Sequence, residues 1–388
     1  MKHYYSDLHI HLGRTPSGRP VKITGSDSLT IDNILTEAFY RKGMDIVGVI
    51  DCHVPEILEH LKSMASDGAV DELADGGVQY QGLTLMLGTE IEVYDHHCHG
   101  PAHVLAFFPY IHKIEQFSQW LAQHVTNITL STQRYFGTIQ ALQTKIHDLD
   151  GLFIPAHIFT PFKSAYGVAV KRSLGEIFDL DQIDAVELGL SADTGMADQI
   201  PELHQFTFLT NSDAHSTPKI AREYQTFAME APTFSEFRRV LKKQGNRNVV
   251  ANYGLNPRLG KYHKTCCAIC FHQIRDDVRV CPYCGSQRII TGVSNRLQEL
   301  KSEHGKSPER PPYIHQVPLE FIPKVGPKTL TKLITAFGSE MNVMHEVSTA
   351  ELQDVVGRQV ANLIVKGRDG SLAFETGGAG RYGRVKDE

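Results

Sequence analysis

Short apolar runs alternate with amphipathic stretches along the first 250 residues of the chain. The runs have the length of buried strands, and the stretches between them repeat with helical spacing, as Ile31, Ile34, Leu35 and Ala38 do. Alternation of strands and helices over this length predicts an α/β fold, either a barrel or a doubly wound sheet. The predicted strands are a first one around 4–8, then 46–50, 83–87, 103–108, 152–156 and 206–210.

Side chains that bind metals stand where these predicted strands end. Polar residues also cap strands for structural reasons alone, but such caps are usually Gly, Ser or Asn rather than His and Asp. In a barrel the carboxyl ends of the strands converge on one face, where barrel enzymes hold their reacting groups. We therefore expect one site built from several strand ends. Its candidate residues are His9, His11, Asp51, His53, Glu90, His157, Asp213 and His215.

The spacing of these residues suits divalent metal ions. Residues i and i+2 of a strand point to the same side, so His9 and His11 can bind one ion together, and Asp213 and His215 can do the same. Imidazoles combined with carboxylates suit Zn²⁺, Mn²⁺ or Fe²⁺, and a carboxylate such as Glu90 can bridge two ions. Paired ions of this kind activate water and neutralise charge during phosphoryl displacement.

A second metal site is predicted from the cysteines. The chain has seven, and five of them lie between residues 266 and 284. Paired C-x-x-C spacing in one short segment predicts a four-thiolate zinc site, which is structural because protein ligands fill all four positions. Redox chemistry is the alternative, and Cys266 is either a spare or a replacement for Cys267. The predicted ligands are Cys267, Cys270, Cys281 and Cys284.

Two segments near the C-terminus resemble helix-hairpin-helix motifs. The first contains Lys324, Gly326 and Lys328, and the second contains Gly357 and Arg358. A glycine at such a hairpin lets the N–H groups of a helix N-terminus approach a DNA phosphate without an intervening side chain. The alternative is an ordinary helical bundle with a Pro-Gly turn.

Composition and charge limit the class of protein. With 41% hydrophobic and 21% charged residues in 388, the chain is globular and long enough for two or three domains. Residues 1–255 hold 20 basic and 30 acidic residues, whereas residues 256–388 hold 19 and 14, so the C-terminal part favours nucleic acid. The N-terminus lacks the apolar stretch of a signal peptide, and no run approaches the ~18 apolar residues of a membrane span. We expect a cytoplasmic protein with no membrane partner.

Five short segments resemble motifs of the PHP (polymerase and histidinol phosphatase) superfamily. They are 7–11 (DLHIH), 88–90 (GTE), 101–105 (PAHVL), 155–157 (PAH) and 211–215 (NSDAH). The resemblance implies a distorted seven-stranded β/α barrel that hydrolyses phosphoesters with two or three divalent ions, namely Zn, Mn or Mg.

The resemblance also implies roles for individual residues. Cys52 separates Asp51 from His53 where the superfamily has an adjacent pair, so either can be the ligand. The stretch 12–16 carries no acidic residue or histidine, so two ions are expected, with three as the alternative. Asp213, Glu90 and His11 are the expected catalytic residues. The implied ligands are His9, His11, Asp51 or His53, Glu90, His103, His157, Asp213 and His215.

A PHP barrel, a zinc ribbon and a helix-hairpin-helix tail in one chain resemble the endonuclease Q family. Segments 155–167 and 254–263 carry this likeness outside the metal motifs. The likeness implies cleavage of DNA 5′ of deaminated bases (uracil, hypoxanthine and xanthine) and at abasic sites, in DNA repair. The barrel, 1–252, would cut, while a zinc-binding domain, 253–300, and a helical domain, 301–388, would hold the DNA.

Recognition of a damaged base requires that it leave the stack. Phe159, Phe162 and Tyr166 follow His157 closely and are candidates for its pocket, with a role as core aromatics as the alternative. Such an enzyme would act on the nucleoid, and its protein partners in repair or replication are not identifiable from the sequence. The other classes considered are a PHP phosphatase for a small phosphomonoester or nucleotide, and a DNA-binding scaffold with an inactive barrel.

Overall fold

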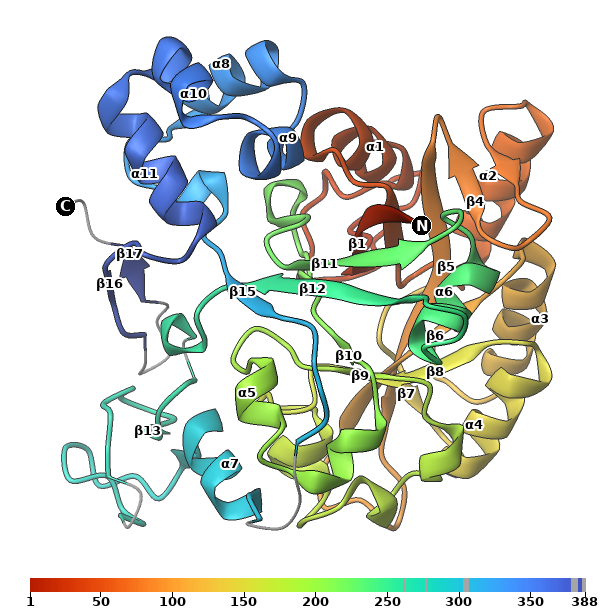
Figure 1. Ribbon diagram of the computed structural model, residues 1–388. Coiled ribbons are helices and arrows are strands. Elements are labelled where there is room, and N and C mark those ends of the chain that lie inside the picture. Colours follow the sequence, from red (N-terminus) through yellow and green to blue (C-terminus); the bar gives the residue numbers. More distant parts are fainter. Residues whose placement is uncertain (261, 276–277, 303–306, 378–382, 386–388) are drawn as a thin grey trace.

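The computed structural model describes residues 1–260, 262–275, 278–302, 307–377 and 383–385 (Figure 1). Seven strands close into a barrel, so the predicted α/β barrel is confirmed and the doubly wound sheet is not formed. The barrel strands are β1 (Lys2–Ile10), β2 (Ile46–Val49), β5 (Leu83–Val93), β6 (Ala102–Phe108), β8 (Leu152–Pro155), β9 (Val186–Glu187) and β10 (Phe208–Leu209).

A few backbone hydrogen bonds complete the barrel where the regular ladders stop. β1, β2 and β5 are parallel neighbours, and β9 and β10 form a parallel pair. Asp184 N donates to Phe153 O at 3.0 Å and joins β8 to β9. Ala214 N donates to His9 O at 3.0 Å and joins the end of β10 to β1. The second contact brings the H-x-H segment directly beside the S-D-A-H segment.

Strand β6 runs against its neighbours in the barrel. It is antiparallel to both β5 and β8. A reversed strand presents its first residues at the end of the barrel where the parallel strands present their last ones. For this reason His103, near the start of β6, reaches the same face as His9, near the end of β1.

Beyond β1 the sheet continues through three more strands. β11 (Tyr224–Met229) pairs antiparallel with β1, β12 (Asn248–Gly254) pairs antiparallel with β11, and β15 (Tyr313–His315) lies parallel to β12. The predicted helical domain, 301–388, therefore begins with a segment that belongs to the barrel sheet. The short strands that complete this sheet are β3 (Asp71–Glu72), β4 (Val78–Tyr80) and β7 (Arg134–Tyr135).

Amphipathic helices cover the barrel. In α4 the N-cap Thr138 accepts the N–H of Ala141 at 3.3 Å, and Ile139, Leu142 and Ile146 are buried on one side. In the part of the chain that the structure describes, no helix has the length and apolar character needed to cross a bilayer. The helices around the barrel are α1 (Ile31–Thr36) with its continuation η1 (Glu37–Lys42), α2 (Pro55–Ser66), α3 (Ile111–Leu121), α4 (Ile139–Asp148), α5 (Thr194–Ala197) and α6 (Phe234–Leu241).

Alternate strand residues belong to two apolar cores. Leu85 packs in the core that the strands share with α1 to α4, whereas its neighbour Met86 packs in a second core with Phe237 of α6. Residues i and i+4 of a strand point to the same side, so Glu90 continues the row of Met86. The site that contains Glu90 therefore lies at the end of the rows of strand side chains that form the second core.

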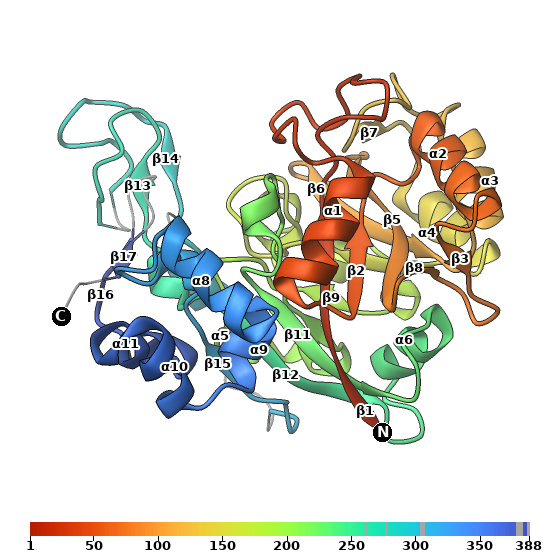
Figure 2. The same ribbon diagram turned by 90° about the horizontal axis from the view of Figure 1, so that it is seen from above.

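Two smaller parts lie beside the barrel (Figure 1). Figure 2 shows the first of them, the β13–β14 ribbon, standing apart from the barrel at the upper left. The first part contains β13 (Cys266–Cys267), β14 (Ile289–Ile290) and α7 (Val293–Leu300). The second contains α8 (Pro327–Phe337), α9 (Glu340–His345), α10 (Thr349–Val356) and α11 (Arg358–Arg368), followed by the hairpin β16 (Phe374–Glu375) and β17 (Arg384–Val385).

An ion pair and an aromatic contact fix the helical part to the barrel. Lys42 Nζ on η1 lies 3.0 Å from Glu340 Oε2 on α9, and both side chains are buried. His345 at the end of α9 stacks on Tyr5 of β1 with ring centroids 4.8 Å apart, and its Nε2 is 2.6 Å from the hydroxyl of Tyr224 on β11. These contacts hold α9 against the strands that carry the H-x-H segment.

Candidate metal centre

His9 and His11 stand at the end of β1 with buried imidazoles that face two carboxylates. His9 Nε2 lies 3.5 Å from both Glu90 Oε1 and Asp213 Oδ1. His11 Nε2 lies 3.5 Å from Glu90 Oε2 and 3.6 Å from the same Asp213 oxygen. Two ligands that bind one ion at ~2.1 Å in tetrahedral directions are ~3.4 Å apart. Each of the two carboxylates therefore has the spacing of a ligand that shares an ion with these histidines.

Glu90 also belongs to a second group of ligand atoms. Its Oε1 is 2.9 Å from His103 Nδ1 and 3.4 Å from His157 Nε2. On the other side of the centre, His215 Nδ1 is 3.5 Å from Asp213 Oδ1. Three overlapping groups, each with ligand atoms within 4.8 Å of one another, together contain seven of the nine predicted positions. Glu90 lies between the two groups, where a bridging carboxylate has to be.

Two buried nitrogen atoms without hydrogen-bond partners indicate whether metal ions fit this centre. Nε2 of His9 and Nε2 of His11 are buried and make no hydrogen bond within the described residues. A buried polar atom without a partner costs about 1–3 kcal/mol. Divalent ions bind imidazole nitrogen together with carboxylate oxygen, which is the donor set present here. The residues therefore fit the metal ions that the sequence implies.

Carboxylates behind the first two histidines fix their orientation. Both oxygens of Glu187 lie close to His9 Nδ1, at 2.9 and 3.1 Å, and Asp51 Oδ2 lies 3.1 Å from His11 Nδ1. When Nδ1–H donates to a carboxylate, Nε2 is left unprotonated and available to a metal. The arrangement presents the Nε2 atoms of both rings to Glu90 and Asp213.

Neither Asp51 nor His53 joins the gathered ligand atoms, so metal binding by either residue stays a prediction. Asp51 Oδ2 accepts the Leu12 N–H at 2.8 Å in addition to its contact with His11. His53 Nδ1 lies 2.8 Å from Thr89 Oγ1. Neither residue belongs to the groups of three or more ligand atoms that the described residues form. Asp51 positions His11, because its Oδ2 contacts both the imidazole and the N–H of Leu12.

Sequence reasoning missed three residues of this centre. Glu187 lies on β9, a two-residue strand inside the apolar run 185–190, and that run is the signal that could have found it. Lys22 Nζ donates to Glu90 Oε2 at 3.2 Å and to Thr132 Oγ1 at 2.6 Å. Lys22 and Thr132 come from loops, and no periodicity or motif marks either of them.

The buried charges keep the centre suited to cations. Burial alone would raise the pKa of Glu90, but His103 and Lys22 hold it well below its ordinary value. Burial lowers the pKa of His11 to about 4, so this imidazole is neutral at physiological pH. An ionised Glu90 beside a neutral His11 is the state that metal binding requires of this pair.

Two ligand segments have unusual backbone conformations. His157 has φ 30° and Asp213 has φ 46°, both in the left-handed region that residues other than glycine rarely adopt. Arg222 donates from Nε to Ser212 O at 2.7 Å and from Nη2 to Asp213 O at 3.2 Å. Such conformations persist where surrounding contacts hold the backbone in place, and they are concentrated at functional sites.

Two adjoining cavities open over the ligands. The smaller, about 200 Å³, is lined by His11, Glu90 and Asp213 and by the lysines Lys22 and Lys163. The larger, about 510 Å³, shares Asp213 with the first and is lined by the side chains His157, Thr160, Phe162, Glu187, Asn211, His215, Lys219, Arg222 and Tyr262, among others.

Only one of the three aromatics predicted for a base pocket faces these cavities. Phe162 is 46% exposed and meets Tyr262 edge to face with ring centroids 5.3 Å apart. Phe159 and Tyr166 are 1% and 0% exposed and stack on each other in the core, and the Tyr166 hydroxyl donates to Glu202 at 2.6 Å. The expectation for Phe159 and Tyr166 is wrong, because their rings are enclosed by other residues.

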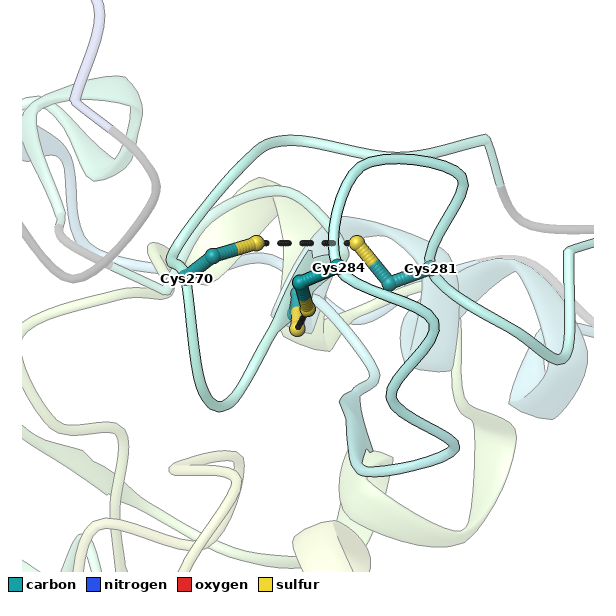
Figure 3. A group of neighbouring side chains, drawn as sticks. Cys270, Cys281 and Cys284 are labelled. Carbon is teal, nitrogen blue, oxygen red and sulfur yellow. Dashed lines mark hydrogen bonds between the residues drawn. The ribbon is translucent and has the colours of Figure 1, made fainter.

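The four predicted thiol ligands come together in the small part that contains β13 and β14. Cys267 Sγ lies 3.6 Å from Cys284 Sγ, and Cys270 Sγ lies 3.6 Å from Cys281 Sγ. Figure 3 shows Cys270 and Cys281 facing one another with Cys284 beside them. The backbone N–H groups of Cys270 and Ile269 lower the pKa of Cys267 to about 6, which favours the thiolate that zinc binds. The group fits a zinc ribbon.

The glycines of the predicted hairpins stand at helix N-termini. Gly326 precedes α8, and Gly357, with φ 79°, joins α10 directly to α11. A Cβ added at either glycine would meet no heavy atom within 4 Å, so both helix ends are open. Lys324, Lys328 and Arg358 are exposed next to them. The placement suits a phosphate contact, and the role in DNA binding stays a prediction.

The fold and the centre define a PHP-type metal-dependent phosphoesterase. A seven-stranded barrel gathers H-x-H, Glu, His and D-x-H side chains at one end, as the sequence predicts. No protein-family model matches the chain. The uncharacterized protein YqxK of Bacillus subtilis (strain 168) is 51% identical over 386 residues, which cover 100% of both chains.

Solved structures resemble the whole chain. The lesion-specific endonuclease PfuEndoQ from Pyrococcus furiosus is 31% identical, with a TM-score of 0.85 over 100% of this chain and 96% of that one. Endonuclease Q in complex with a 27-mer duplex substrate, with an abasic lesion at the active site, is 30% identical, with a TM-score of 0.85 over 100% and 97%. The chain belongs to the endonuclease Q family. It is an enzyme of that class, a metal-dependent endonuclease.

Proposed function

We propose that this chain is a DNA repair endonuclease that hydrolyses the phosphodiester on the 5′ side of damaged nucleotides. Its substrates would be the deaminated bases uracil, hypoxanthine and xanthine, and abasic sites. The observation that carries the proposal is the position of Glu90 between two groups of histidines beneath an open cavity. The likeness over the whole length to a protein solved with an abasic duplex supports DNA as the substrate.

The residues of the chain prepare the centre in three ways. Glu187 and Asp51 hold the first two imidazoles in the orientation that exposes Nε2. Glu90 joins the two ligand groups, because its Oε1 lies near His9 of one group and near His103 and His157 of the other. Arg222 holds the backbone of Asp213 in its left-handed conformation. Divalent ions, when bound, would lower the pKa of a water molecule and neutralise charge on the phosphoryl group.

The larger cavity is the proposed site for a nucleotide that has left the stack. Phe162 and Tyr262 line one side of it, and the exposed Phe162 ring offers a stacking surface to a base. Asn211 and Ser191 supply polar groups on the other lining segments. A lesion that pairs poorly leaves the stack at a lower cost, which is one source of selectivity for damaged sites.

A groove lined by two basic residues, of which Lys219 is paired with Glu320 at 2.8 Å, connects this cavity to the helical part. Lys219 and Arg222 line the larger cavity and also a groove of about 540 Å³ that reaches Phe321 to Pro323. That groove ends just before the hairpin at Gly326. A DNA strand along this path would contact the barrel and the helical domain together, and the zinc ribbon would add a further surface. Such an enzyme would act on the nucleoid in the cytoplasm.

The test uses end-labelled duplexes that carry one uracil, hypoxanthine, xanthine or abasic site, with Mg²⁺ or Mn²⁺, beside an undamaged duplex. We expect one cut on the 5′ side of the lesion. Asp213→Asn should abolish it, because the carboxylate ligand is lost while Asn tolerates the left-handed backbone better than Ala does. The exposed Asp67→Asn is the matched control and should cut normally.

Two results would overturn the proposal. One is retained cleavage by the Asp213→Asn protein, since the barrel would then not carry the activity. The other is an uncut lesion together with turnover of a small phosphomonoester or nucleotide. That result would indicate a PHP phosphatase instead.

A further inference from the structure

Lys22 places an ammonium group inside the metal centre. It lies in the loop between β1 and α1, where its N–H donates to Leu12 O at 2.9 Å and the N–H of Val21 donates to Gly13 O at 2.9 Å. These two bonds lay the loop alongside the residues that follow His11. The side chain of Lys22 is only 15% exposed, because it extends into the centre rather than into solvent.

The ammonium is held in a tight polar triangle. Lys22 Nζ donates to Glu90 Oε2 at 3.2 Å and to Thr132 Oγ1 at 2.6 Å, and the Thr132 hydroxyl donates to the same Glu90 oxygen at 2.5 Å. Thr132 has φ 53°, which is a costly conformation for a β-branched residue. This unfavourable conformation occurs where Thr132 contacts Lys22 and Glu90. Such conformations are common at functional sites.

The position leaves Lys22 able to bind a ligand. An ammonium has three N–H donors, and among the described residues Glu90 and Thr132 take two of them. Lys22 also lines the smaller cavity, together with the ligands His11 and Asp213. A phosphate oxygen in that cavity can accept the third N–H.

We propose that Lys22 is a fixed cation of the catalytic centre, which donates to a non-bridging oxygen of the scissile phosphate and occupies the place of a further divalent ion beside Glu90. No proton or electron is transferred in this role. A charge fixed next to the phosphate stabilises the negative charge that gathers on its oxygens during displacement. The phosphate contact rests on the proposed function, whereas the effect of Lys22 on metal binding does not.

A purely structural role for Lys22 predicts a different response to its removal. If Lys22 only keeps Glu90 in place, removing it disorders a ligand, and metal affinity and activity fall together. If Lys22 substitutes for an ion, removing its charge makes the centre more attractive to divalent cations while the phosphate loses a donor. Metal affinity and activity then move in opposite directions.

The experiment compares the wild type with Lys22→Met, Lys22→Arg and the control Lys62→Met. Lys62 forms ion pairs with Glu59 and Glu115 on the helices outside the barrel. Binding of Mn²⁺ alone is followed by the paramagnetic resonance of the free ion, and kcat is measured on the abasic duplex at saturating Mn²⁺. Thermal unfolding of each variant checks that it is folded.

We expect Lys22→Met to bind Mn²⁺ about tenfold more tightly, or to bind one more ion, while its kcat falls roughly 100-fold. Lys22→Arg should keep the wild-type Mn²⁺ affinity and recover part of the rate, and Lys62→Met should match the wild type. Thr132→Val, which removes a partner without changing charge, should lower kcat and leave Mn²⁺ affinity unchanged.

Either of two outcomes would overturn the inference. One is weaker Mn²⁺ binding together with a lower rate in Lys22→Met, which would show that Lys22 only positions Glu90. The other is an unchanged kcat in that variant. If the wild type does not cut the duplex, the proposed function fails, but the Mn²⁺ titration still decides whether Lys22 takes the place of an ion.

Discussion

The carboxylate of Glu187 and the imidazole of His9 form a buried pair, with both carboxylate oxygens within 3.1 Å of Nδ1 and neither residue more than 1% exposed. Glu187 also accepts the backbone N–H of His157 at 2.8 Å and an amide hydrogen of Asn211 at 2.8 Å. One side chain thus orients the first ligand and anchors the segment of another. We therefore expect the whole centre to depend on it.

Replacing Glu187 with Gln should lower Mn²⁺ affinity about 10–100-fold, because the amide holds the His9 imidazole less firmly than a carboxylate does. Cleavage at limiting Mn²⁺ should fall and recover at high Mn²⁺. The control is Glu202→Gln, which removes the carboxylate that accepts from Tyr166 in the core and should lower Tm only. Wild-type Mn²⁺ affinity in Glu187→Gln would contradict the positioning role.

The two hairpin glycines should respond differently to Ala. Gly326 has φ −79° and open space around it, so Gly326→Ala should leave Tm unchanged and weaken DNA binding severalfold by placing a methyl group at the helix end. Gly357 has φ 79° and ψ 159°, a region that residues other than glycine hardly adopt, so Gly357→Ala should weaken binding and also cost about 1–3 kcal/mol of stability. Anisotropy of a labelled abasic duplex, measured in the Asp213→Asn background, and thermal melts check both. Unchanged affinity in Gly326→Ala would exclude the phosphate contact.

Acid should loosen the contact between the helical part and the barrel. The Tyr224 hydroxyl donates to Gln316 at 2.5 Å and so accepts from His345 Nε2, while burial, with a smaller contribution from Arg368, lowers the pKa of His345 to about 4. The unfolded chain takes up this proton near pH 6.5, so the stabilisation is complete above that pH and is lost as the pH falls toward 4.

The control for that prediction is His345→Gln, which cannot be protonated. Between pH 7.5 and pH 5 the stability of the wild type relative to this variant should fall by about 1–2 kcal/mol, as measured by denaturant unfolding at both pH values. Limited proteolysis should then cut between the barrel and the helical part more readily at pH 5. An equal pH dependence of stability in both proteins would show that His345 is not the group responsible.

Loss of one thiol from the four-cysteine group should release one zinc ion. We expect elemental analysis to find one zinc ion fewer per chain in Cys270→Ser than in the wild type. This variant should also bind the abasic duplex more weakly, because the ribbon loses the metal that crosslinks it. Cys98→Ser is the matched control, since Cys98 lies outside the group. A full zinc content in Cys270→Ser would show that the four sulfurs do not share an ion.

The barrel and most of its candidate ligands could be predicted because they depend on local patterns. Apolar runs stand just before Glu90, His157 and Asp213 and predict the strands β5, β8 and β10, although β5 continues past Glu90 to Val93. The reversal of β6 could not be read from its sequence, since an apolar run has the same pattern in either direction. His103 was found through its motif, and only the structure explains how it reaches the others.

The missed residues and the wrong expectations share a physical cause. Glu187 lies on a strand too short to give a periodic signal, and Lys22 reaches the centre from a loop whose path depends on tertiary contacts. Asp51 carries ligand chemistry, but its orientation behind His11 depends on the packing of two strands. Phe159 and Phe162 are three positions apart, and only the three-dimensional path of the chain decides which ring is exposed.

The reversed strand β6 has a consequence for the order in which the centre forms during folding. Glu90 and His103 lie in one antiparallel pair of strands, 13 positions apart in the chain, so their contact requires the closure of a short loop. His9 and Asp213 are separated by most of the barrel and can meet only when β10 joins β1. The contact between Glu90 and His103 can therefore form early, whereas the group that contains Asp213 is completed only after β10 has been synthesised.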